Sequence, residues 1–329
     1  MQTDLLQTST GAKRKEAVAR AVQLLDKGEI VALPTETVYG LAADALNPTA
    51  VVKIFEAKER PRFDPLIVHI SERQWLEKIA DVRAGDRQLI LRLTDTFWPG
   101  PFTVVLPKRE FVPDIVTAGL DTIAVRISPH PIFDEIVCAF GKPLAAPSAN
   151  RFGQVSPTTA QHVLHELEGR ISLIIDAGPT EHGLESTIIA VQDDRIRILR
   201  RGPITAEQLS KFAKVDIVAP TQTISSPGQL PSHYAPKTAL ELIDTAENYS
   251  PKRHERVGLL AWRRIESLQR FAAVRHLSQG QDCREAAANL FRYLRELDAL
   301  GLDRIIAERV PSQGLGAAMM DRLERAAHR

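Results

Sequence analysis

Three cationic side chains lie within five positions in Lys58-Glu59-Arg60-Pro61-Arg62, just before the apolar run Leu66–Ile70. Like charges this close repel one another unless an anion or solvent lies among them. A second segment, Leu144–Asn150, is a short apolar run that ends in Ser148 and Asn150. Such a run is typical of a buried strand that delivers polar side chains to the end of a sheet. Together the two segments predict an anion pocket, with a polyphosphate as the expected ligand. The alternative for the cations is a solvated helix end.

Other polar side chains follow or interrupt predicted strands. Thr35 comes directly after the apolar run Ile30–Leu33, where it either ends the strand or forms part of a hydroxyl-lined ligand site. His69 lies inside an apolar run close to the cations, as a structural histidine or as a ligand contact. Arg126 lies in a strand pattern and is expected to be paired, because a buried charge without a partner is costly. Arg200 adds a further cation at the end of a later strand.

Several common site motifs are missing from the sequence. It contains no G-x-G-x-x-G or P-loop pattern, no G-x-S-x-G elbow and no cluster of residues with metal-ligand spacing. Cys138 and Cys283 are far apart and are predicted to be reduced core thiols. A site made of cations and hydroxyls works chiefly by positioning its ligands and stabilising charge.

Composition limits the class of protein. The chain has 329 residues, 44% hydrophobic and 25% charged, which are ordinary globular values and sufficient for two domains. A formal charge of +1 gives no support for a large nucleic-acid footprint. No apolar run approaches the roughly 20 residues of a membrane span, and residues 1–16 lack the apolar core of a signal peptide. We therefore expect a soluble, cytoplasmic protein.

Helical and strand patterns alternate along the first two thirds of the chain, which predicts an α/β domain built on a mixed sheet. The expected strands are Ile30–Leu33, Leu66–Ile70, Thr103–Leu106, Ile123–Ile127, Leu144–Ala146, Leu173–Ile175, Thr187–Val191 and Ile196–Leu199. The last two flank Asp193-Asp194 and are predicted to form a hairpin. Helices are expected around Ala17–Leu25, from Asn47-Pro48, and over Asp86–Phe97, His130–Phe140, Thr158–Leu167 and Ala206–Phe212.

The composition then changes, which divides the chain into three parts. We expect a large α/β domain over residues 12–215, a Pro-rich linker over 216–237 and a small α/β domain over 238–329. The small domain should contain strands Ala239–Ile243, Val257–Ala261 and Arg304–Ala307 and helices Cys283–Ala299 and Gly316–Ala327. The linker is either a plain spacer or, because His233-Tyr234 is unusual in a spacer, a lid that closes over a ligand.

The combination of motifs resembles the YrdC-like threonylcarbamoyl-AMP synthases, in their long, two-domain form. The motifs are Pro34–Leu41, Lys58-x-Arg60-Pro61 with Pro65-Leu66, Ser148-x-Asn150, Glu185-Ser-Thr187, Ser226-Pro-Gly228 and His233-Tyr-Ala-Pro236. The resemblance implies a twisted open mixed sheet around a large cavity, followed by a small Rossmann-like domain. It also implies that L-threonine, bicarbonate and ATP are converted to threonylcarbamoyl-AMP and pyrophosphate. A transient partner, a tRNA threonylcarbamoyl-transferase, would then modify the adenosine next to the anticodon.

The resemblance also implies roles for individual residues. The expected catalytic residues are Lys58 and Arg60, which neutralise the triphosphate. The expected ATP-binding residues are Lys58, Arg60, Arg62, Thr122, Ser148, Asn150, Ser156, Arg200 and Tyr234. The expected threonine-binding residues are Thr35, His69, Arg126, Ala146 and Ser186, with Arg126 forming a bidentate fork to the carboxylate. No protein-bound metal is expected, and Mg²⁺ would be carried by the phosphates.

Three alternatives stay open at this point. A carbamoyl-transfer module of the hydrogenase-maturation type is disfavoured because such proteins resemble larger assemblies with Cys-rich zinc motifs. A passive module for double-stranded RNA would need a basic outer face, although a weak RNA contact is compatible with this sequence. The small domain could bind a nucleotide by itself, but Val257-Gly258-Leu259 lacks the phosphate-binding glycines.

Overall fold

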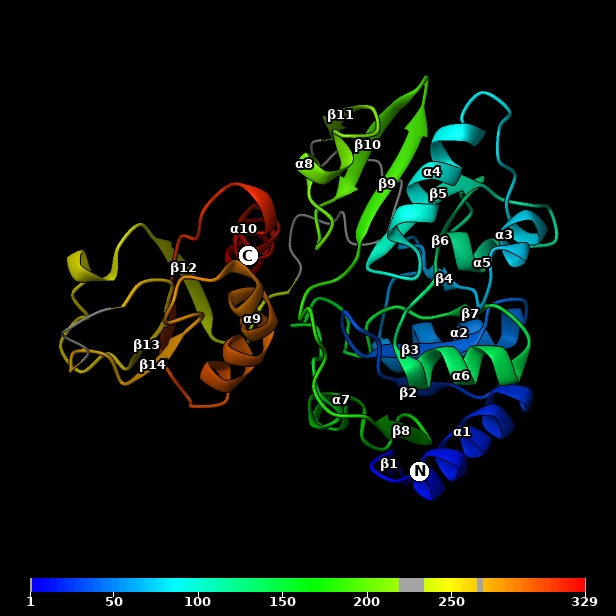
Figure 1. Cartoon of the computed structure of the whole chain (residues 1–329). Helices are drawn as coiled ribbons and strands as arrows, with labels where there is room; N and C mark the ends of the chain where they lie inside the picture. Colours follow the sequence, from blue (N-terminus) through cyan, green and yellow to red (C-terminus); the bar gives the residue numbers. More distant parts are fainter. Residues whose placement is uncertain (1, 219–233, 265–268, 329) are drawn as a thin grey trace.

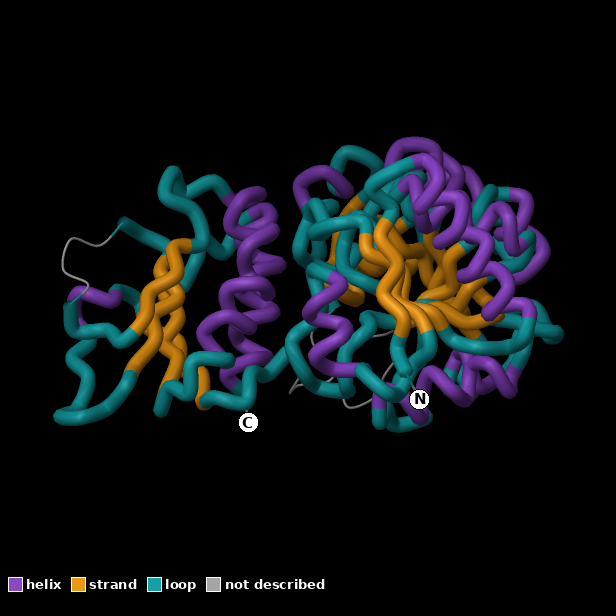
Figure 2. The backbone as a smooth tube through the Cα atoms, turned by 90° about the horizontal axis from the view of Figure 1, so that it is seen from below, coloured by secondary structure: helices purple, strands orange, loops and turns teal. Residues whose placement is uncertain are grey.

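Two sheets organise the chain in the computed structural model, which describes residues 2–218, 234–264 and 269–328. The larger, mixed sheet has the order β1-β8-β2-β3-β7-β4-β6-β5-β9-β10-β11, and helices surround it (Figures 1 and 2). Its strands are β1 (Asp4–Gln7), β2 (Val31–Leu33), β3 (Gly40–Asp44), β4 (Ile67–His69), β5 (Phe102–Pro107), β6 (Thr122–Arg126), β7 (Leu144–Ala145), β8 (Leu173–Asp176), β9 (Thr187–Gln192), β10 (Arg195–Arg200) and β11 (Lys214–Ile217). We call this part the N-terminal domain.

The helices of the N-terminal domain form where local signals favour them. Asn47 caps α2 through its side chain and Pro48 occupies the first turn, as the sequence predicts. Thr10 and Thr159 cap two other helices in the same way. The helices are α1 (Gly11–Asp26), α2 (Pro48–Lys58), α3 (Gln74–Ile79), α4 (Arg87–Phe97), α5 (Asp114–Thr117), α6 (Pro131–Phe140), α7 (Ala160–Leu167) and α8 (Ala206–Leu209). Their apolar faces bury side chains against the sheet, which is the main source of stability in such a fold.

The predicted strands are all present, and the hairpin between β9 and β10 is confirmed, with Asp193 and Asp194 at positive φ. Two outer strands extend the sheet beyond the expected domain limits of 12 and 215. Strand β1 pairs with β8, and β11 pairs with β10 and ends at Ile217. Both are half-exposed edge strands, so their sequences lack the apolar runs that predict a buried strand.

The C-terminal domain, residues 238–328, is a separate layer structure. Its four-stranded sheet has the order β12-β15-β13-β14 with every pairing parallel. The elements are β12 (Ala239–Ile243), η1 (Ala246–Asn248), β13 (Val257–Ala261), β14 (Ala273–His276), α9 (Cys283–Asp298), β15 (Arg304–Glu308) and α10 (Gly314–Ala327). Helices α9 and α10 lie between this sheet and the N-terminal domain (Figures 1 and 2). Their outer faces therefore meet the larger domain.

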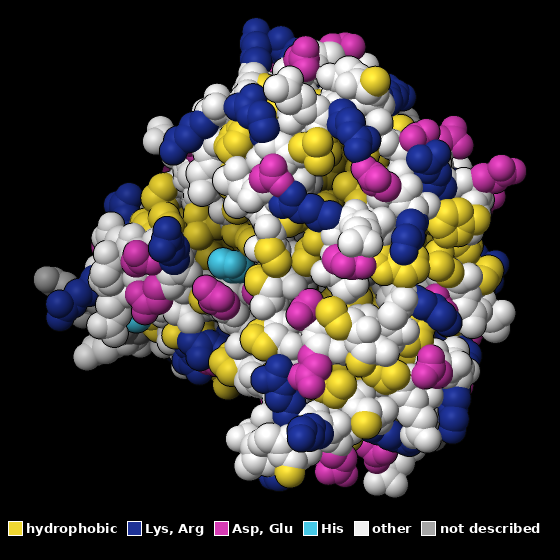
Figure 3. Space-filling view, turned by 45° about the vertical axis from the view of Figure 1, so that its right-hand side comes forward, with side chains coloured by type: hydrophobic (Ala, Val, Ile, Leu, Met, Phe, Trp, Pro, Cys, Tyr) yellow, Lys and Arg dark blue, Asp and Glu magenta, His cyan; other side chains and the backbone are white. Residues whose placement is uncertain are grey.

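Some sequence predictions fall elsewhere. Most of the expected linker, residues 219–233 with His233, lies outside the described residues. Cys138 is exposed and Cys283 half-buried, so the prediction that both thiols belong to the core is wrong. Within the described ranges, no helix is both long enough and apolar enough to span a membrane. On the face shown in Figure 3, cationic and acidic side chains are interspersed rather than gathered into one basic area.

Candidate active site

A cavity lies on one face of the large sheet, with about 570 Å³ of empty space when the part open to solvent is included. Ile67 and His69 both line it, and they are two positions apart in β4, so their side chains point to the same face. The cavity brings together nine of the predicted site residues: Thr35, Arg60, His69, Arg126, Ala146, Ser148, Ser186, Arg200 and Tyr234. These residues come from segments spread between positions 35 and 234 of the sequence, and the sheet register places them around one space.

The basic loop begins where α2 ends. Glu59 adopts the left-handed conformation at φ 54° and turns the chain after Lys58. The Lys58 ammonium is buried and donates hydrogen bonds to the backbone oxygens of Ser148 and, at 2.5 Å, Asn150. Burial, then the charge of Arg60, lowers the pKa of Lys58 well below 10.5, although nearby carboxylates oppose this shift. Lys58 thus ties the basic loop to the segment after β7.

Arg60 points into the cavity and is held by its own loop. Its guanidinium forms an ion pair with Asp64 at 2.8 Å and donates to the backbone oxygen of Pro65, also at 2.8 Å. Burial lowers the pKa of Arg60, and the Asp64 carboxylate opposes that effect. Arg62, in contrast, is exposed and does not line the cavity.

A turn after β2 forms the next part of the wall. The Thr35 hydroxyl donates to the backbone oxygen of Val38 at 2.6 Å and accepts from the backbone N–H of Thr37 at 3.1 Å. Gly40 then forms an isolated bridge with Ser148, which fixes the two segments side by side. A Cβ on Gly40 would lie 3.3 Å from the Cβ of Ala146, so a small residue suits this close approach.

His69 is a buried and neutral imidazole. Burial lowers its pKa to about 3, against backbone hydrogen bonds that favour the charged form. Its ring lies 4.9 Å from the Phe133 ring, and its Nδ1 atom has no hydrogen-bond partner among the described residues. In the β4–β6 pairing His69 stands opposite Arg126. A polar atom without a partner beside a cation is suited to a ligand contact.

Arg126 belongs to a buried set that includes Glu36 and Ser128. Its guanidinium forms an ion pair with Glu36 and donates to the Thr37 hydroxyl at 3.2 Å, while the Ser128 hydroxyl donates to the other Glu36 oxygen. Arg126 Nε has no hydrogen-bond partner among the described residues. Burial, then the charge of Arg200, lowers the pKa of Arg126 to about 9, which leaves it cationic at neutral pH.

The opposite wall follows the start of β9 and the end of β10. Arg200 donates from Nε to the backbone oxygen of Ser186 and from a terminal nitrogen to its hydroxyl, both at 3.1 Å. Glu185 also lines the cavity and accepts from the Ser156 hydroxyl at 2.5 Å and from Arg322 at 2.9 Å. Burial would raise the pKa of Glu185, but Arg322 and then Arg200 lower it below its usual value.

Tyr234 closes one side of the cavity. Its side chain is buried, stacks on Phe291 at 5.4 Å between ring centroids and lies under the Arg322 guanidinium at 5.1 Å. Burial raises the pKa of Tyr234 to about 12, so the phenol is neutral.

Five predicted site residues do not line the cavity: Lys58, Arg62, Thr122, Asn150 and Ser156. Lys58, Asn150 and Ser156 lie directly behind its wall, and the Asn150 side chain donates to Arg151 and Gln154 backbone oxygens. Thr122 lies four positions from Arg126, at the other end of β6. No individual site role was predicted for the carboxylates Glu36, Asp64 and Glu185, although Glu36 and Glu185 lie in motifs quoted above and Asp64 is four positions from Arg60.

Two family models match the chain. One, described as Telomere recombination (Sua5_yciO_yrdC), covers residues 23–202, and the other, the threonylcarbamoyl-AMP synthase C-terminal domain, covers residues 204–328. The threonylcarbamoyl-AMP synthase of Bacillus subtilis is 40% identical, over 94% of this chain and 92% of that protein. The Pyrococcus abyssi enzyme is 38% identical, over 93% and 92%. The chain belongs to the threonylcarbamoyl-AMP synthase family.

Solved structures agree with this family assignment. The crystal structure of P. abyssi Sua5 complexed with L-threonine is 35% identical and matches with a TM-score of 0.87, over 99% of this chain and 98% of that one. A doubly substituted variant of the same protein matches with a TM-score of 0.89 at 34% identity, over 99% and 96%. The expected fold, a mixed sheet around a cavity followed by a small α/β domain, is confirmed. As a threonylcarbamoyl-AMP synthase, the chain is an enzyme that transfers an adenylyl group.

Proposed function

We propose that this cavity holds L-threonine and ATP side by side and joins the carbamate of threonine to the α-phosphate of ATP. The observation that carries the proposal is the pairing of two kinds of group in one buried space. Arg126, with a spare Nε donor, and neutral His69 stand opposite each other on β6 and β4, and the cations Arg60 and Arg200 line the same cavity. The first pair suits an amino-acid carboxylate and hydroxyl, whereas the cations suit phosphates.

The chemistry needs no nucleophile from the protein. The neutral threonine amine attacks the carbon of bicarbonate, which forms the N–C bond of a carbamate. A C–O bond of bicarbonate breaks, and its oxygen leaves as water with a proton from the amine. A carbamate oxygen then attacks the α-phosphorus, the bond to the β-phosphate oxygen breaks, and pyrophosphate leaves. We propose that Thr35, Ala146 and Ser186 shape the threonine side, and that Ser148 and Tyr234 contact the nucleotide. Holding both substrates in a buried site supplies most of the catalysis through positioning and charge stabilisation.

Some residues predicted to bind ATP do not line the cavity, so direct contact with ATP inside the cavity is not proposed for them. We propose that Lys58, Asn150 and Ser156 act from behind the wall, and that Arg62 and Thr122 reach the nucleotide only if the ligand extends beyond the cavity. Among the described residues there is no cluster of three or more His, Cys, Asp or Glu that could hold a metal. Mg²⁺ would therefore be bound by phosphate oxygens and water, and Asp64 and Glu185 are the buried carboxylates that line the cavity.

The product is an unstable mixed anhydride, so a consuming enzyme must take it up quickly. We propose a transient encounter with a tRNA threonylcarbamoyl-transferase in the cytoplasm, where tRNA is available. The interspersed charges on the face in Figure 3 favour at most a weak direct contact with RNA on that face.

The test is pyrophosphate release by purified protein from ATP, with and without L-threonine and bicarbonate. Release that requires both co-substrates is expected, and release that ignores threonine would contradict the proposal. Arg60→Ala should lower turnover by about 10²-fold or more, as is usual for the loss of an electrostatic donor. Lys58→Ala should lower it by a similar factor, because it releases the segment that carries Ser148. Arg87→Ala is the control, because its ion pair with Glu77 is exposed on both sides.

A further inference from the structure

The two domains meet around two shielded arginines of the C-terminal domain. Arg295 lies in α9 and Arg322 in α10, and their side chains are 11% and 0% exposed. Charged groups this deeply placed are costly to bury unless several partners satisfy them. Their partners therefore show which parts of the N-terminal domain the interface holds in place.

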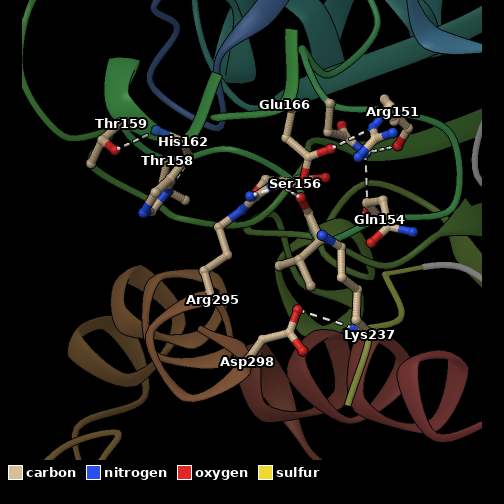
Figure 4. A network of polar contacts seen from close by, with 12 residues as sticks. Arg151, Gln154, Ser156, Thr158, Thr159, His162, Glu166, Lys237, Arg295 and Asp298 are labelled. Carbon is tan, nitrogen blue, oxygen red and sulfur yellow. Dashed lines mark hydrogen bonds and ion pairs between the residues drawn. The ribbon is translucent and has the colours of Figure 1, made fainter. Parts of the chain in front are cut away.

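Arg295 crosses from α9 to the segment that follows β7 (Figure 4). It forms an ion pair with Glu166 at 3.1 Å and donates to the backbone oxygens of Val155 and Ser156. Glu166 is shared with Arg151, which comes from the same segment. Arg295 thus fixes the backbone that carries Ser156.

Arg322 reaches the other side of the same wall. Its Nε donates to Glu185 at 2.9 Å, one terminal nitrogen donates to the backbone oxygen of Arg201 at 2.9 Å, and the other pairs with Asp321. The same guanidinium lies over the Tyr234 ring. One side chain from α10 therefore contacts the Glu185 segment, the end of β10 and Tyr234.

The two arginines act on one connected unit. Ser156, whose backbone Arg295 holds, donates its hydroxyl to Glu185, whose carboxylate Arg322 holds. Glu185 lines the cavity and precedes Ser186, which receives both hydrogen bonds from Arg200. A shift of either helix would therefore move the wall that carries Glu185, Ser186 and Tyr234.

Gly183 supplies an independent contact between the same segment and α9. Its φ is +66°, and a Cβ built on it would lie 2.5 Å from the backbone oxygen of Ala287 and 2.6 Å from the Cα of Ala288. The loop before Glu185 thus packs directly on the helix backbone, where no flexible side chain can absorb a displacement.

We propose that Arg295 and Arg322 are positioning residues through which the C-terminal domain sets the shape of the nucleotide side of the cavity. This inference rests on the proposed placement of ATP beside Arg200 and Tyr234. A domain that only adds stability would change the amount of folded enzyme. A domain that positions this wall changes the affinity for ATP while the protein stays folded.

The experiment measures steady-state pyrophosphate release with each substrate varied, for the wild type, Arg322→Met and Arg295→Met in the full chain. We expect the KM for ATP to rise at least tenfold in Arg322→Met and the KM for threonine to rise by a smaller factor, because Ser186 is the residue of the threonine side that lies on this wall. Arg322→Lys should give an intermediate value, since an ammonium can pair with Glu185 but lacks the planar fork that also reaches Arg201. The matched control is Arg304→Met, whose ion pairs with Glu241 and Glu255 lie within the C-terminal domain.

A double-mutant cycle with Glu185→Gln tests whether the two residues act together. We expect the effects of Arg322→Met and Glu185→Gln on the KM for ATP to be strongly non-additive. Wild-type ATP affinity in folded Arg322→Met and Arg295→Met, or fold-changes that simply multiply in the cycle, would overturn the inference. If Arg322→Met fails to fold, Arg295→Met and Arg322→Lys decide by the same criterion.

Direct ATP binding, measured calorimetrically without threonine, separates this inference from the proposed reaction. Weaker ATP binding in Arg322→Met, in a protein whose wild type releases no pyrophosphate, would refute the reaction and support the positioning role. Normal pyrophosphate release by the wild type, with unchanged ATP binding in both methionine variants, would support the reaction and refute the positioning role.

Discussion

Two buried Arg–Glu–Ser sets border the cavity, one through Arg126 and one through Glu185. In Arg126–Glu36–Ser128 all three residues belong to the N-terminal domain, whereas Arg322 joins Glu185–Ser156 from the other domain. In each set a serine hydroxyl donates to the carboxylate. The sets differ in whether every guanidinium nitrogen of the arginine has a hydrogen-bond partner. Arg126 lines the cavity and its Nε lacks a partner among the described residues, whereas Nε and both terminal nitrogens of Arg322 have partners. Both arginines form an ion pair with a glutamate. Arg126 can still donate a hydrogen bond to a ligand, whereas Arg322 holds the cavity wall in place.

The largest effect should come from removing Arg126. Arg126→Met leaves the Glu36 carboxylate buried without its cation, which should cost about 3–5 kcal/mol in the free energy of unfolding. We expect kcat/KM for threonine to fall by about 10²-fold or more as well. Urea unfolding and pyrophosphate release measure the two effects.

The double variant Arg126→Met/Glu36→Gln separates these effects. It should recover most of the lost stability, because no buried charge is left alone, without recovering activity. An unchanged KM for threonine in either variant would show that Arg126 does not contact threonine. Arg126 and Arg322 would then no longer differ in their roles.

The interdomain side of the comparison is tested at Gly183. In Gly183→Ala the new methyl meets the α9 backbone, and we expect a loss of about 3 kcal/mol from overpacking and left-handed strain together. Gly178→Ala is the matched control, since Gly178 also has positive φ but has open space around its Cβ position. It should lose only about 1 kcal/mol. Equal losses in urea unfolding would show that the contact with α9 carries no strain.

His69 should make the free energy of unfolding depend on pH. Its native pKa of about 3 lies below the ordinary 6.5, so its stabilising contribution is complete above pH 6.5 and is lost as the pH falls toward 3. Between pH 7 and pH 5 the loss from this residue should be about 2 kcal/mol. His69→Gln has no side chain that titrates in this range. The difference in unfolding free energy between wild type and variant should therefore change by the same amount between these two pH values. A difference independent of pH would show that His69 is not a buried neutral imidazole.

The smallest effects should come from the two serines. Ser128→Ala and Ser156→Ala each remove one hydrogen bond to a buried carboxylate and should each cost about 1.5 kcal/mol. The kinetic signatures should diverge: the first should raise the KM for threonine a few-fold and the second the KM for ATP. The same kinetic change in both variants would mean that the two sets serve one binding site rather than two.

Much of the N-terminal fold could be predicted from the sequence, because most of its buried strands are apolar runs and its helices carry caps such as Asn47. The buried strand β3 was missed, since it begins with Gly40 and ends with Asp44. The cavity residues were predictable in part for the same reason. Thr35 and Ser148 follow apolar runs, so their type and position indicate a site at the end of a strand. The edge strands β1 and β11 could not be recognised, since one row of backbone groups faces solvent and their side chains are only half-buried.

The partners of the buried arginines could not be predicted at all. Helix α10 has an amphipathic pattern, and nothing local distinguishes Arg322, which contacts Glu185, from a cation that faces water. The match between Arg126 and Glu36 depends on a register that only the assembled sheet defines. Sequence pattern shows which side chains are polar, but tertiary packing decides which of them meet.

The distance along the chain between these partners has a consequence for how the enzyme becomes active. Arg322 and Glu185 are 137 positions apart, and Arg295 and Val155 are 140 apart. Closing such long loops costs entropy before the contacts form. Full ATP affinity should therefore depend on the docking of α10 onto the N-terminal domain. A newly made chain would acquire catalytic competence only after α10 has been synthesised and docked.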